Sequence, residues 1–511
     1  MNRIYRIFGE TADCVKGRSY LLGDLHNHCG ISYGHGSIEQ AVDFACQQLD
    51  FFSVTGHYAW PDIDRSESMA IPDDVVEYHR LGFERLRRNW PHYREVMKRA
   101  QENGTEAFLS YEYHSFLTGD YTVVLKDILA DLPSKADDTT EESRLLEIIA
   151  DESLSDRRLA FPHHIGYKTG FRGINWEYYN DKACPLIEII SMHGCSEASD
   201  SPMPYLHTMG PRCNENTMRS GLGSGFRFGV LGCTDHHNAS PGSYGFGRTG
   251  LWSEDSSRDA IWRNLYCRNT VALSGDPVEL YLNCVRKDSS HACLEGFAAG
   301  YDELSYVQLI CDGRLVAQYK GNGPQNSTYC IPFGFGWGKK GIPCFWRISV
   351  EIAGSKIEKV VPRLRGEDIV APLDRPSGSI SRPTFRSDGN RTDMSFVTCG
   401  NINTTSDNTQ GLVAELEIGP DTSVTVCIDT EWNGRERHFE HTYSGEELIS
   451  NDHVEYIDGF VSPCMRLGKA VNCKMASCHF RTDVDISAGS YAYIRLLQEN
   501  GSFAVSSPIF L

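Results

Sequence analysis

Short apolar segments recur along the first 275 residues, and each ends in a side chain that can bind a metal ion. In chain order these segments are residues 20–22, 51–54, 107–110, 159–161, 186–190 and 228–231. Short apolar runs of this kind are typical of buried strands. Strands that alternate with helices and carry polar residues at their ends are typical of a parallel barrel with a site on its C-terminal face. We therefore expect residues far apart in sequence to converge on one rim.

Helical spacing appears between several of these segments. Ser37-Ile-Glu-Gln40 has the form of a capping box and predicts a helix that continues to Leu49. The long charged stretch 73–103 is helical in period, and we expect Pro91 to break it. Further helices are expected at 141–152 and 257–267, followed by a short strand at 270–273.

The pattern changes after about Asp276, where helical periodicity fades. Short alternating runs separated by Gly, Asn, Asp and Pro occur at 306–310, 345–352, 424–428 and 491–496. Such alternation predicts antiparallel strands, which we expect to form a sandwich. The stretch from Gly366 to Asn390 is rich in Pro, Ser and Gly and is expected to be a long loop or an internal linker. The sequence thus predicts two domains, residues 1–275 and 276–511.

Composition and net charge limit the classes of molecule that the protein is expected to bind. The chain has 511 residues, of which 40% are apolar and 23% charged, as expected for a globular protein. Lys and Arg total 49 against 68 for Asp and Glu, which gives a net charge of −19. So acidic a chain argues against nucleic acid and anionic membranes as partners and favours a small-molecule substrate. A homo-oligomer is compatible with the sequence, which does not define the oligomeric state.

Cysteine usage and the absence of apolar spans bear on location. The 18 cysteines are scattered and form no Cys-x-x-Cys pair, so we interpret them as mostly reduced, small buried residues. The first twenty residues contain no apolar signal region, and no later stretch approaches eighteen uninterrupted apolar residues. We therefore expect a cytoplasmic protein.

The side chains at the strand ends form the candidate metal site. A His-x-His pair alone, such as His26 and His28, is weak evidence, because a single histidine more often has a structural role. Because metal-binding side chains recur at six strand ends, metal binding is the preferred interpretation for the group as a whole. Seven imidazoles and two carboxylates suit Zn, Mn or Fe, and two or three divalent ions sharing a bridging carboxylate would use them all. The candidate ligands are His26, His28, His35, His57, Glu112, His163, His193, Asp235 and His237.

Some of these assignments have local competitors. His35 is less secure because it lies in a loop after the first strand. His163 competes with its neighbour His164, and His237 competes with His236, although the Asp-x-His spacing favours His237. His114, two residues past Glu112, is interpreted as a wall residue, with accessory ligation as the alternative.

This set resembles the PHP superfamily of metal-dependent phosphoesterases, named for polymerase and histidinol phosphatase. The resemblance covers roughly residues 18 to 275 and fills all nine motif positions. The matching residues are Asp24-Leu-His26-Asn-His28, His35, Thr55-Gly56-His57, Glu112, His163-His164, His193 and Asp235-His236-His237. Four further segments are similar to a large branch of PHP-like proteins that carry a C-terminal β domain, namely residues 191–197, 235–242, 258–262 and 504–510.

The resemblance implies a distorted (β/α)7 barrel, within an α/β fold class, with a trinuclear site. It implies one ion held by His26, His28, Glu112 and Asp235, a second by Glu112, His163 and His193, and a third by His35, His57 and His237. Two positions depart from the family pattern. Gly56 replaces the usual aspartate, so an outer partner is missing, and His164 replaces the usual proline. These departures put a standard phosphatase pocket in doubt.

Three further residues are candidates for contact with substrate. Lys168 and Arg172 follow the His163 strand end and could bind a phosphate or carboxylate, or they could be solvated loop charges. His164 could protonate a leaving group if its pKa is near 7.

These observations favour a metal-dependent hydrolase in which a metal-bridging hydroxide attacks a small phosphoester. The first alternative is a hydrolase or lyase that cleaves a non-phosphate C–O or C–N bond on the same cluster. A second alternative is a non-enzymatic protein that senses metal, with the β domain as a recognition module. Amidohydrolase barrels also begin with His-x-His but usually close on a lone aspartate. No P-loop or dinucleotide-binding fingerprint is present, so no organic cofactor is expected.

Overall fold

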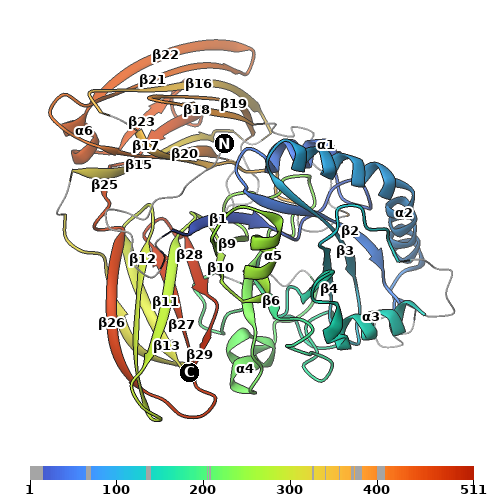
Figure 1. Cartoon of the computed structure of the whole chain (residues 1–511). Coiled ribbons are helices and arrows are strands. Elements are labelled where there is room, and N and C mark those ends of the chain that lie inside the picture. Colours follow the sequence, from blue (N-terminus) through green and yellow to red (C-terminus); the bar gives the residue numbers. More distant parts are fainter. Residues whose placement is uncertain are drawn as a thin grey trace.

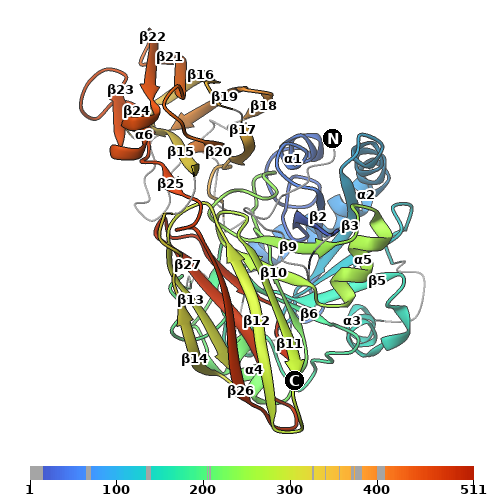
Figure 2. The same ribbon diagram turned by 60° about the vertical axis from the view of Figure 1, so that its left-hand side comes forward.

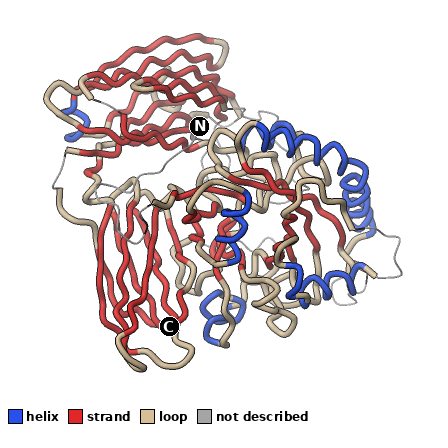
Figure 3. The backbone as a smooth tube through the Cα atoms, in the orientation of Figure 1, coloured by secondary structure: helices blue, strands red, loops and turns tan. Residues whose placement is uncertain are grey.

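The computed structural model describes residues 15, 17–64, 71–133, 140–203, 205, 209–324, 327–339, 341–355, 357–369, 373, 383–399 and 409–511. These residues form a mixed α/β structure with many strands and few helices. The helices lie mostly in the N-terminal half, whereas the C-terminal half is almost entirely strand and loop (Figure 3). No described helix has the length and apolar character needed to cross a bilayer.

All six apolar segments of the N-terminal half are strands, as the sequence predicts. They are β1 (Ser19–Asp24), β2 (Phe51–Ala59), β3 (Glu106–Tyr113), β5 (Arg158–Pro162), β6 (Leu186–Ser191) and β8 (Gly229–Gly232). Four more strands complete this half, namely β4 (Tyr121–Leu125), β7 (Gly194–Cys195), β9 (Arg248–Ser253) and β10 (Thr270–Leu273). β2 and β8 are buried along their whole length, which explains why their sequences read as continuous apolar runs.

The predicted helices are present, with two corrections. The helix α1 (Ile38–Ala45) begins at the capping box, where the Ser37 hydroxyl accepts from the amide of Gln40, but it ends at Ala45 and does not continue to Leu49. The helix α2 (Asp73–Glu102) continues through Pro91, so the expected break there is wrong. Proline costs a helix interior about 3 kcal/mol, and the buried residues Trp90 and Tyr93 beside it offset that cost. The remaining helices are α3 (Glu141–Ala150), α4 (Met218–Gly223), α5 (Arg258–Tyr266), α6 (Gly445–Ser450) and the 3-10 turns η2 (Glu152–Leu154) and η3 (Asn214–Asn216).

A regular (β/α)7 barrel is not confirmed. Among the described strands of this half, β1, β2 and β3 pair in parallel, and so do β6 and β8. In contrast, β4, β5, β9 and β10 pair antiparallel with their neighbours. Strands from both halves form one large sheet in the order β14-β13-β27-β28-β10-β9-β1-β2-β3-β4-β5, in which β13 is Leu304–Cys311, β14 is Arg314–Tyr319, β27 is Tyr491–Gln498 and β28 is Phe503–Ser506. β6 lies between β7 and β8 in a separate small sheet.

The end of the chain returns to the N-terminal half. β28 (Phe503–Ser506) pairs antiparallel with β10 of the N-terminal half (Figures 1 and 2). β27 (Tyr491–Gln498) continues the same sheet and pairs with β13 (Leu304–Cys311), while β14 (Arg314–Tyr319) and β29 (Ile509–Phe510) lie at its margin. A second layer consists of β11 (Glu279–Arg286), β12 (His291–Ala299) and β26 (Ser477–Asp485). The sheet therefore crosses the predicted domain boundary at residue 275.

Two facing sheets make up the rest of the C-terminal half. The predicted strands at 345–352 and 424–428 lie in one of them, as β16 (Pro343–Ala353) and β21 (Ser423–Trp432), whereas those at 306–310 and 491–496 are β13 and β27 of the large sheet. Buried residues such as Phe333 and Trp346, one from each sheet, share a single apolar core. The alternating burial along β16 places every second side chain in that core, as its sequence predicts. One sheet holds β15 (Thr328–Trp337), β17 (Ile357–Arg363), β20 (Gln410–Glu417), β23 (His453–Tyr456), β24 (Pro463–Leu467) and β25 (Val471–Asn472). The other holds β16 (Pro343–Ala353), β18 (Thr384–Asp388), β19 (Arg391–Cys399), β21 (Ser423–Trp432) and β22 (Arg435–Ser444).

Two smaller expectations concern loops and thiols. Of the expected linker Gly366–Asn390, residues 370–372 and 374–382 lie outside the described part, and β18 occupies 384–388. The described cysteines are all free thiols, as expected. Two of them, Cys330 and Cys473, lie with their sulfurs 3.6 Å apart in the core.

Candidate metal centre

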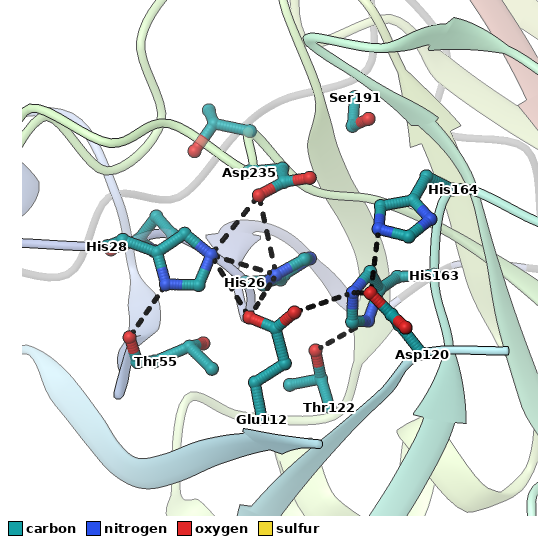
Figure 4. Close-up of polar contacts among 12 residues, drawn as sticks. His26, His28, Thr55, Glu112, Asp120, Thr122, His163, His164, Ser191 and Asp235 are labelled. Carbon is teal, nitrogen blue, oxygen red and sulfur yellow. Dashed lines mark hydrogen bonds and ion pairs between the residues drawn. The ribbon is translucent and has the colours of Figure 1, made fainter. Parts of the chain in front are cut away.

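The predicted ligands converge at the C-terminal ends of β1, β2, β3, β5, β6 and β8. Nε2 of His28 lies 3.1 Å from Nε2 of His26 and 3.1 Å from Oδ1 of Asp235 (Figure 4). The i and i+2 histidines after β1 thus face the same point, as the spacing predicts. These side chains are almost completely shielded from solvent.

Glu112 lies at the centre of the cluster. Its Oε2 is 3.4 Å from Nε2 of His28 and 3.6 Å from Nε2 of both His26 and His57. Its Oε1 is 3.1 Å from Nε2 of His163 on the opposite side. A carboxylate with imidazoles on both sides is suited to bridge two cations.

Asp235 joins a second group of imidazoles. Oδ2 of Asp235 lies 3.0 Å from Nε2 of His193, and Oδ1 lies 3.6 Å from Nε2 of His26. The His237 ring lies tilted against the His28 ring, with the ring centroids 4.3 Å apart. Three side-chain sets that could each hold an ion overlap here, namely His28/His57/His237, His26/His28/Glu112 and His57/Glu112/His114.

The outer nitrogens of these imidazoles are held by the protein. Nδ1 of His28 donates to the carbonyl of Thr55 at 2.8 Å, and Nδ1 of His26 lies 2.8 Å from Glu188. Similar contacts fix the other rings, His57 to Ser32 (2.8 Å), His163 to Thr122 (3.1 Å) and His193 to Tyr167 (2.8 Å). Such partners set the tautomer and aim Nε2 at the cluster, as they do around known metal sites.

The contact between His57 and Ser32 concerns position 56, where this chain has glycine in place of the aspartate of the family pattern. A Cβ atom on Gly56 would lie 2.2 Å from Cδ1 of Leu86, so the close packing of α2 leaves no room for an aspartate there. The Ser32 hydroxyl binds Nδ1 of His57 instead. An outer partner for His57 is therefore supplied from the loop after β1.

The local charges suit cation binding. Burial alone would raise the pKa of Glu112 and Asp235, but the surrounding imidazoles hold both values well below the usual range. Burial and neighbouring imidazoles lower the pKa of His57 and His237 well below 6.5, and that of His163 to about 3. His26 differs, because its burial is outweighed by the carboxylates of Asp235, Glu188 and Glu112, which raise its pKa well above 6.5, so binding of a cation there releases a proton. Ionised carboxylates and neutral imidazoles are the forms that bind metal ions.

His35 is the one predicted ligand that the structure does not bring into these groups. Its amide donates to the carbonyl of His237 at 2.8 Å, so its backbone is tied to the site. Its Nε2 is buried without a hydrogen-bond partner among the described residues. Its role as a ligand stays a prediction.

The competing neighbours differ in their nearest partners, although His163, His164 and Asp120 together form a fourth set that could hold an ion. His163 faces Glu112, whereas Nε2 of His164 faces Oδ2 of Asp120 at 3.4 Å. His237 joins the cluster, whereas Nδ1 of His236 accepts from the amide of Asn238 at 3.0 Å. These placements agree with the choice of His163 and His237 as the candidate ligands.

Two buried carboxylates at the site were not predicted. Asp120 contacts His114, His164 and Arg172. It gave no local signal in the sequence, because it follows a glycine just before β4 begins. Glu188 contacts His26 from within β6. A charged residue inside the apolar run Leu186–Ile190 was a signal that could have identified Glu188.

Both ring nitrogens of His114 contact neighbouring side chains, and its interpretation as a wall residue stays a prediction. Nδ1 lies 2.9 Å from Glu112 and 2.9 Å from Asp120, and Nε2 contacts the hydroxyl of Tyr33. Tyr33 in turn stacks on His57 at 3.6 Å. These two residues thus connect directly to the candidate ligands.

The three candidate substrate contacts lie in different environments. Arg172 forms an ion pair with Asp120, stacks over Trp60 and lines a cavity of about 140 Å³ beside the cluster. Burial lowers the pKa of His164, which also lines that cavity and which is therefore neutral at pH 7. Lys168 is exposed, with its ammonium over Phe171, and is not among the residues that line the cavity.

The donor set fits divalent ions. Oε2 of Glu112 is buried and accepts no hydrogen bond from the described residues. It lies instead among imidazole nitrogens whose opposite sides are already bonded, an arrangement that a cation would satisfy. Mixed imidazole and carboxylate ligation suits Zn, Mn or Fe.

Comparison with solved structures finds similarity to a two-domain protein from Bacteroides vulgatus that contains a predicted PHP-like metal-dependent phosphoesterase. The match has 12% identity and a TM-score of 0.34, and it covers 87% of this chain and 100% of the other. No protein-family model matches the sequence, and a search of curated proteins finds no match. At this identity and TM-score the likeness carries no conclusion about activity, which therefore depends on the motif resemblance and the site geometry.

Proposed function

We propose that this chain is a metal-dependent hydrolase that binds two or three divalent ions on the His/Asp/Glu cluster. The observation that carries the proposal is the 3.1 Å approach of Nε2 of His28 to Nε2 of His26. A carbonyl only accepts hydrogen bonds, so Nδ1 of His28 bears a proton, and in the neutral ring that binds a metal ion Nε2 has the lone pair. A buried lone pair that faces a second imidazole nitrogen and two carboxylates is an arrangement that a bound cation would stabilise.

The proposed reaction is hydrolysis of a small phosphoester. Divalent ions at such a cluster supply Lewis acidity, which activates water and stabilises negative charge. Glu112 and Asp235 would hold the ions, and Arg172 would orient an anionic group of the substrate in the cavity. The cavity of about 140 Å³ limits the reacting group to a small one. Lys168 is left out because of its exposed position, whereas His164 lines the cavity and stays the proposed proton donor, a role that burial opposes by lowering its pKa.

A second candidate is cleavage of a non-phosphate C–O or C–N bond on the same cluster. The ion pair between Arg172 and Asp120 favours it, because that guanidinium is already neutralised by a buried carboxylate. A phosphate dianion would then meet less positive charge than in a typical phosphate pocket.

Phosphoester hydrolysis, measured as inorganic phosphate from monoesters and as released alcohol from diesters, separates the two candidates. The protein, reconstituted with Mn²⁺ or Zn²⁺, would be assayed on a panel of small phosphomonoesters and diesters and on a matched panel of esters and amides. His57→Ala removes a candidate ligand, and Lys168→Ala is a control that changes an exposed charge. Phosphoester hydrolysis that His57→Ala abolishes supports the phosphoesterase. Turnover of esters or amides alone, by protein shown to hold its metals, would favour the second candidate.

A further inference from the structure

A segment of the C-terminal half lies along the loop that carries two candidate ligands. This segment, Leu364–Ile369, follows β17 and is called the strap here. The carbonyl of Ile369 accepts from the amide of His237 at 3.0 Å, and that of Leu364 accepts from the amide of Tyr244 at 2.9 Å. The amide of Gly366 donates to the Ser243 hydroxyl at 3.0 Å. The loop runs from residue 233 to 247, between β8 and β9, and the strap contacts it from residue 237 to 244.

The backbone of this loop is in an unfavourable conformation. Asp235 and Ala239 have φ values of +51° and +50°, in the left-handed region that residues with a Cβ rarely adopt. Such conformations persist only where surrounding contacts enforce them. The position of Asp235 and His237 thus depends on what lies against the loop.

One side of the loop is held by the first metal motif. The amide of Asp235 donates to the carbonyl of His26 at 2.8 Å, and the amide of Ala239 donates to the carbonyl of His28 at 3.0 Å. The amide of His28 donates in return to the carbonyl of His236 at 2.7 Å. The strap supplies contacts to the same loop from the C-terminal half.

The strap is itself anchored to the second half of the chain. Arg363, at its start, makes two 2.8 Å bonds to the buried carboxylate of Asp276. The amide of Arg365 donates to Oε1 of Gln410 at 2.8 Å, and Nε2 of Gln410 donates back to the Arg365 carbonyl at 2.7 Å. The position of the strap therefore follows from the fold of the C-terminal half.

We infer that the strap is a positioning element of the metal centre, through which the C-terminal half holds Asp235 and His237 in place for metal binding. The inference rests on the metal centre proposed above. It gives the β-rich half a role in forming the site, in addition to any recognition role. Full metal affinity then requires contacts made by residues more than a hundred positions from the ligands they support.

Gly366 is the point at which the strap can be displaced with the smallest change. A Cβ atom there would lie 2.1 Å from Oγ and 2.4 Å from Cβ of Ser240, and 3.1 Å from Cε1 of His236. The strap or the loop must move to accept an alanine. Removal of the Ser240 side chain would restore most of that space.

The test compares metal binding by full-length Gly366→Ala, the double variant Gly366→Ala/Ser240→Gly, and wild type. We expect the single variant to bind Co²⁺ or Zn²⁺ about tenfold more weakly or worse, with a changed Co²⁺ absorption spectrum, and the double variant to recover both. Gly468→Ala is the matched control, because its Cβ would lie 2.7 Å from Pro332 in the sandwich. Gln410→Leu, which frees the strap without adding a clash, is the second test if Gly366→Ala does not fold.

Three results would overturn the inference. Wild-type affinity and spectrum in both Gly366→Ala and Gln410→Leu would show that the strap does not position the ligands. The same loss of metal in Gly468→Ala as in Gly366→Ala would show a general effect of destabilisation. A wild-type protein that binds no divalent ion would refute the proposed metal centre and the inference together, which distinguishes that failure from the first two.

Discussion

Oε2 of Glu188 lies 2.8 Å from Nδ1 of His26, on the side of the imidazole that faces away from the cluster. Both side chains are buried. Burial raises the pKa of Glu188, and the His26 imidazole opposes that rise. The carboxylate fixes the His26 ring so that Nε2 points at Glu112 and Asp235. Glu188 is therefore a positioning residue for the candidate metal centre.

Substitution of Glu188 tests this role. Glu188→Gln keeps the shape but weakens the hydrogen bond to His26, so we expect metal affinity to fall about 10- to 100-fold. Isothermal titration with Zn²⁺ or Mn²⁺ measures the change. Glu197→Gln is the matched control, since Glu197 is equally buried but pairs with Arg219 and Arg495 away from the ligands. Equal loss of affinity in both variants would contradict the assignment of Glu188.

Arg172 and Lys168 are predicted to differ in their effect on substrate binding. Arg172 lines the cavity, so Arg172→Lys should raise KM about tenfold or more for an anionic substrate while metal content stays the same. Lys168→Met should leave both KM and kcat within about twofold, because Lys168 is exposed and is not among the residues lining that cavity. Steady-state kinetics on the substrates found in the panel would measure both. A larger effect at Lys168 than at Arg172 would reverse our assignment of the substrate contact.

The sequence predicted the parts of the site that carry local signals. Apolar runs that end in His26, Glu112 or His193 are visible as strands with ligands at their ends, and the strands lie where expected. Asp120 carries no such signal, because its role comes from contacts with side chains brought together by the fold. The pairing of β28 with β10 joins segments more than two hundred residues apart, and no local pattern predicts it.

The unbroken helix α2 and the contacts of the strap are two further features that local sequence patterns do not predict. Pro91 lowers local helix propensity, and only the packing of α2 against the sheet overrides it. The strap lies in the stretch that composition identifies as a linker, yet it makes hydrogen bonds to the metal-binding loop. Tertiary contacts, which the sequence does not display locally, decide both features.

Stability is predicted to fall as pH rises from about 4.5 to about 7 at a buried charge cluster between β11, β17 and β20. Burial raises the pKa of Glu279 and of Glu415 from 4.5 to about 7, and Lys359, 3.7 Å from Glu279, opposes the rise. A raised carboxyl pKa contributes stability below about pH 4.5 that is lost as pH rises to about 7. Glu415→Gln removes this dependence for one group.

Urea unfolding at several pH values tests the prediction. Relative to wild type, Glu415→Gln should gain on the order of 2 kcal/mol between pH 5 and pH 7.5. Glu417→Gln, an exposed position on the same strand, is the control and should show no such trend. A difference between Glu415→Gln and wild type that does not change with pH would contradict the raised pKa of Glu415.

The central claim is that the His/Asp/Glu cluster binds divalent ions, and metal stoichiometry tests it most directly. The full-length protein would be loaded with Mn²⁺ or Zn²⁺, dialysed against metal-free buffer and measured by plasma mass spectrometry, beside Glu112→Gln. We expect two or three ions per wild-type chain and fewer in Glu112→Gln, because Glu112 contacts imidazoles on both of its oxygens. Wild-type protein that retains no ion, or a Glu112→Gln variant with unchanged stoichiometry and affinity, would contradict the account.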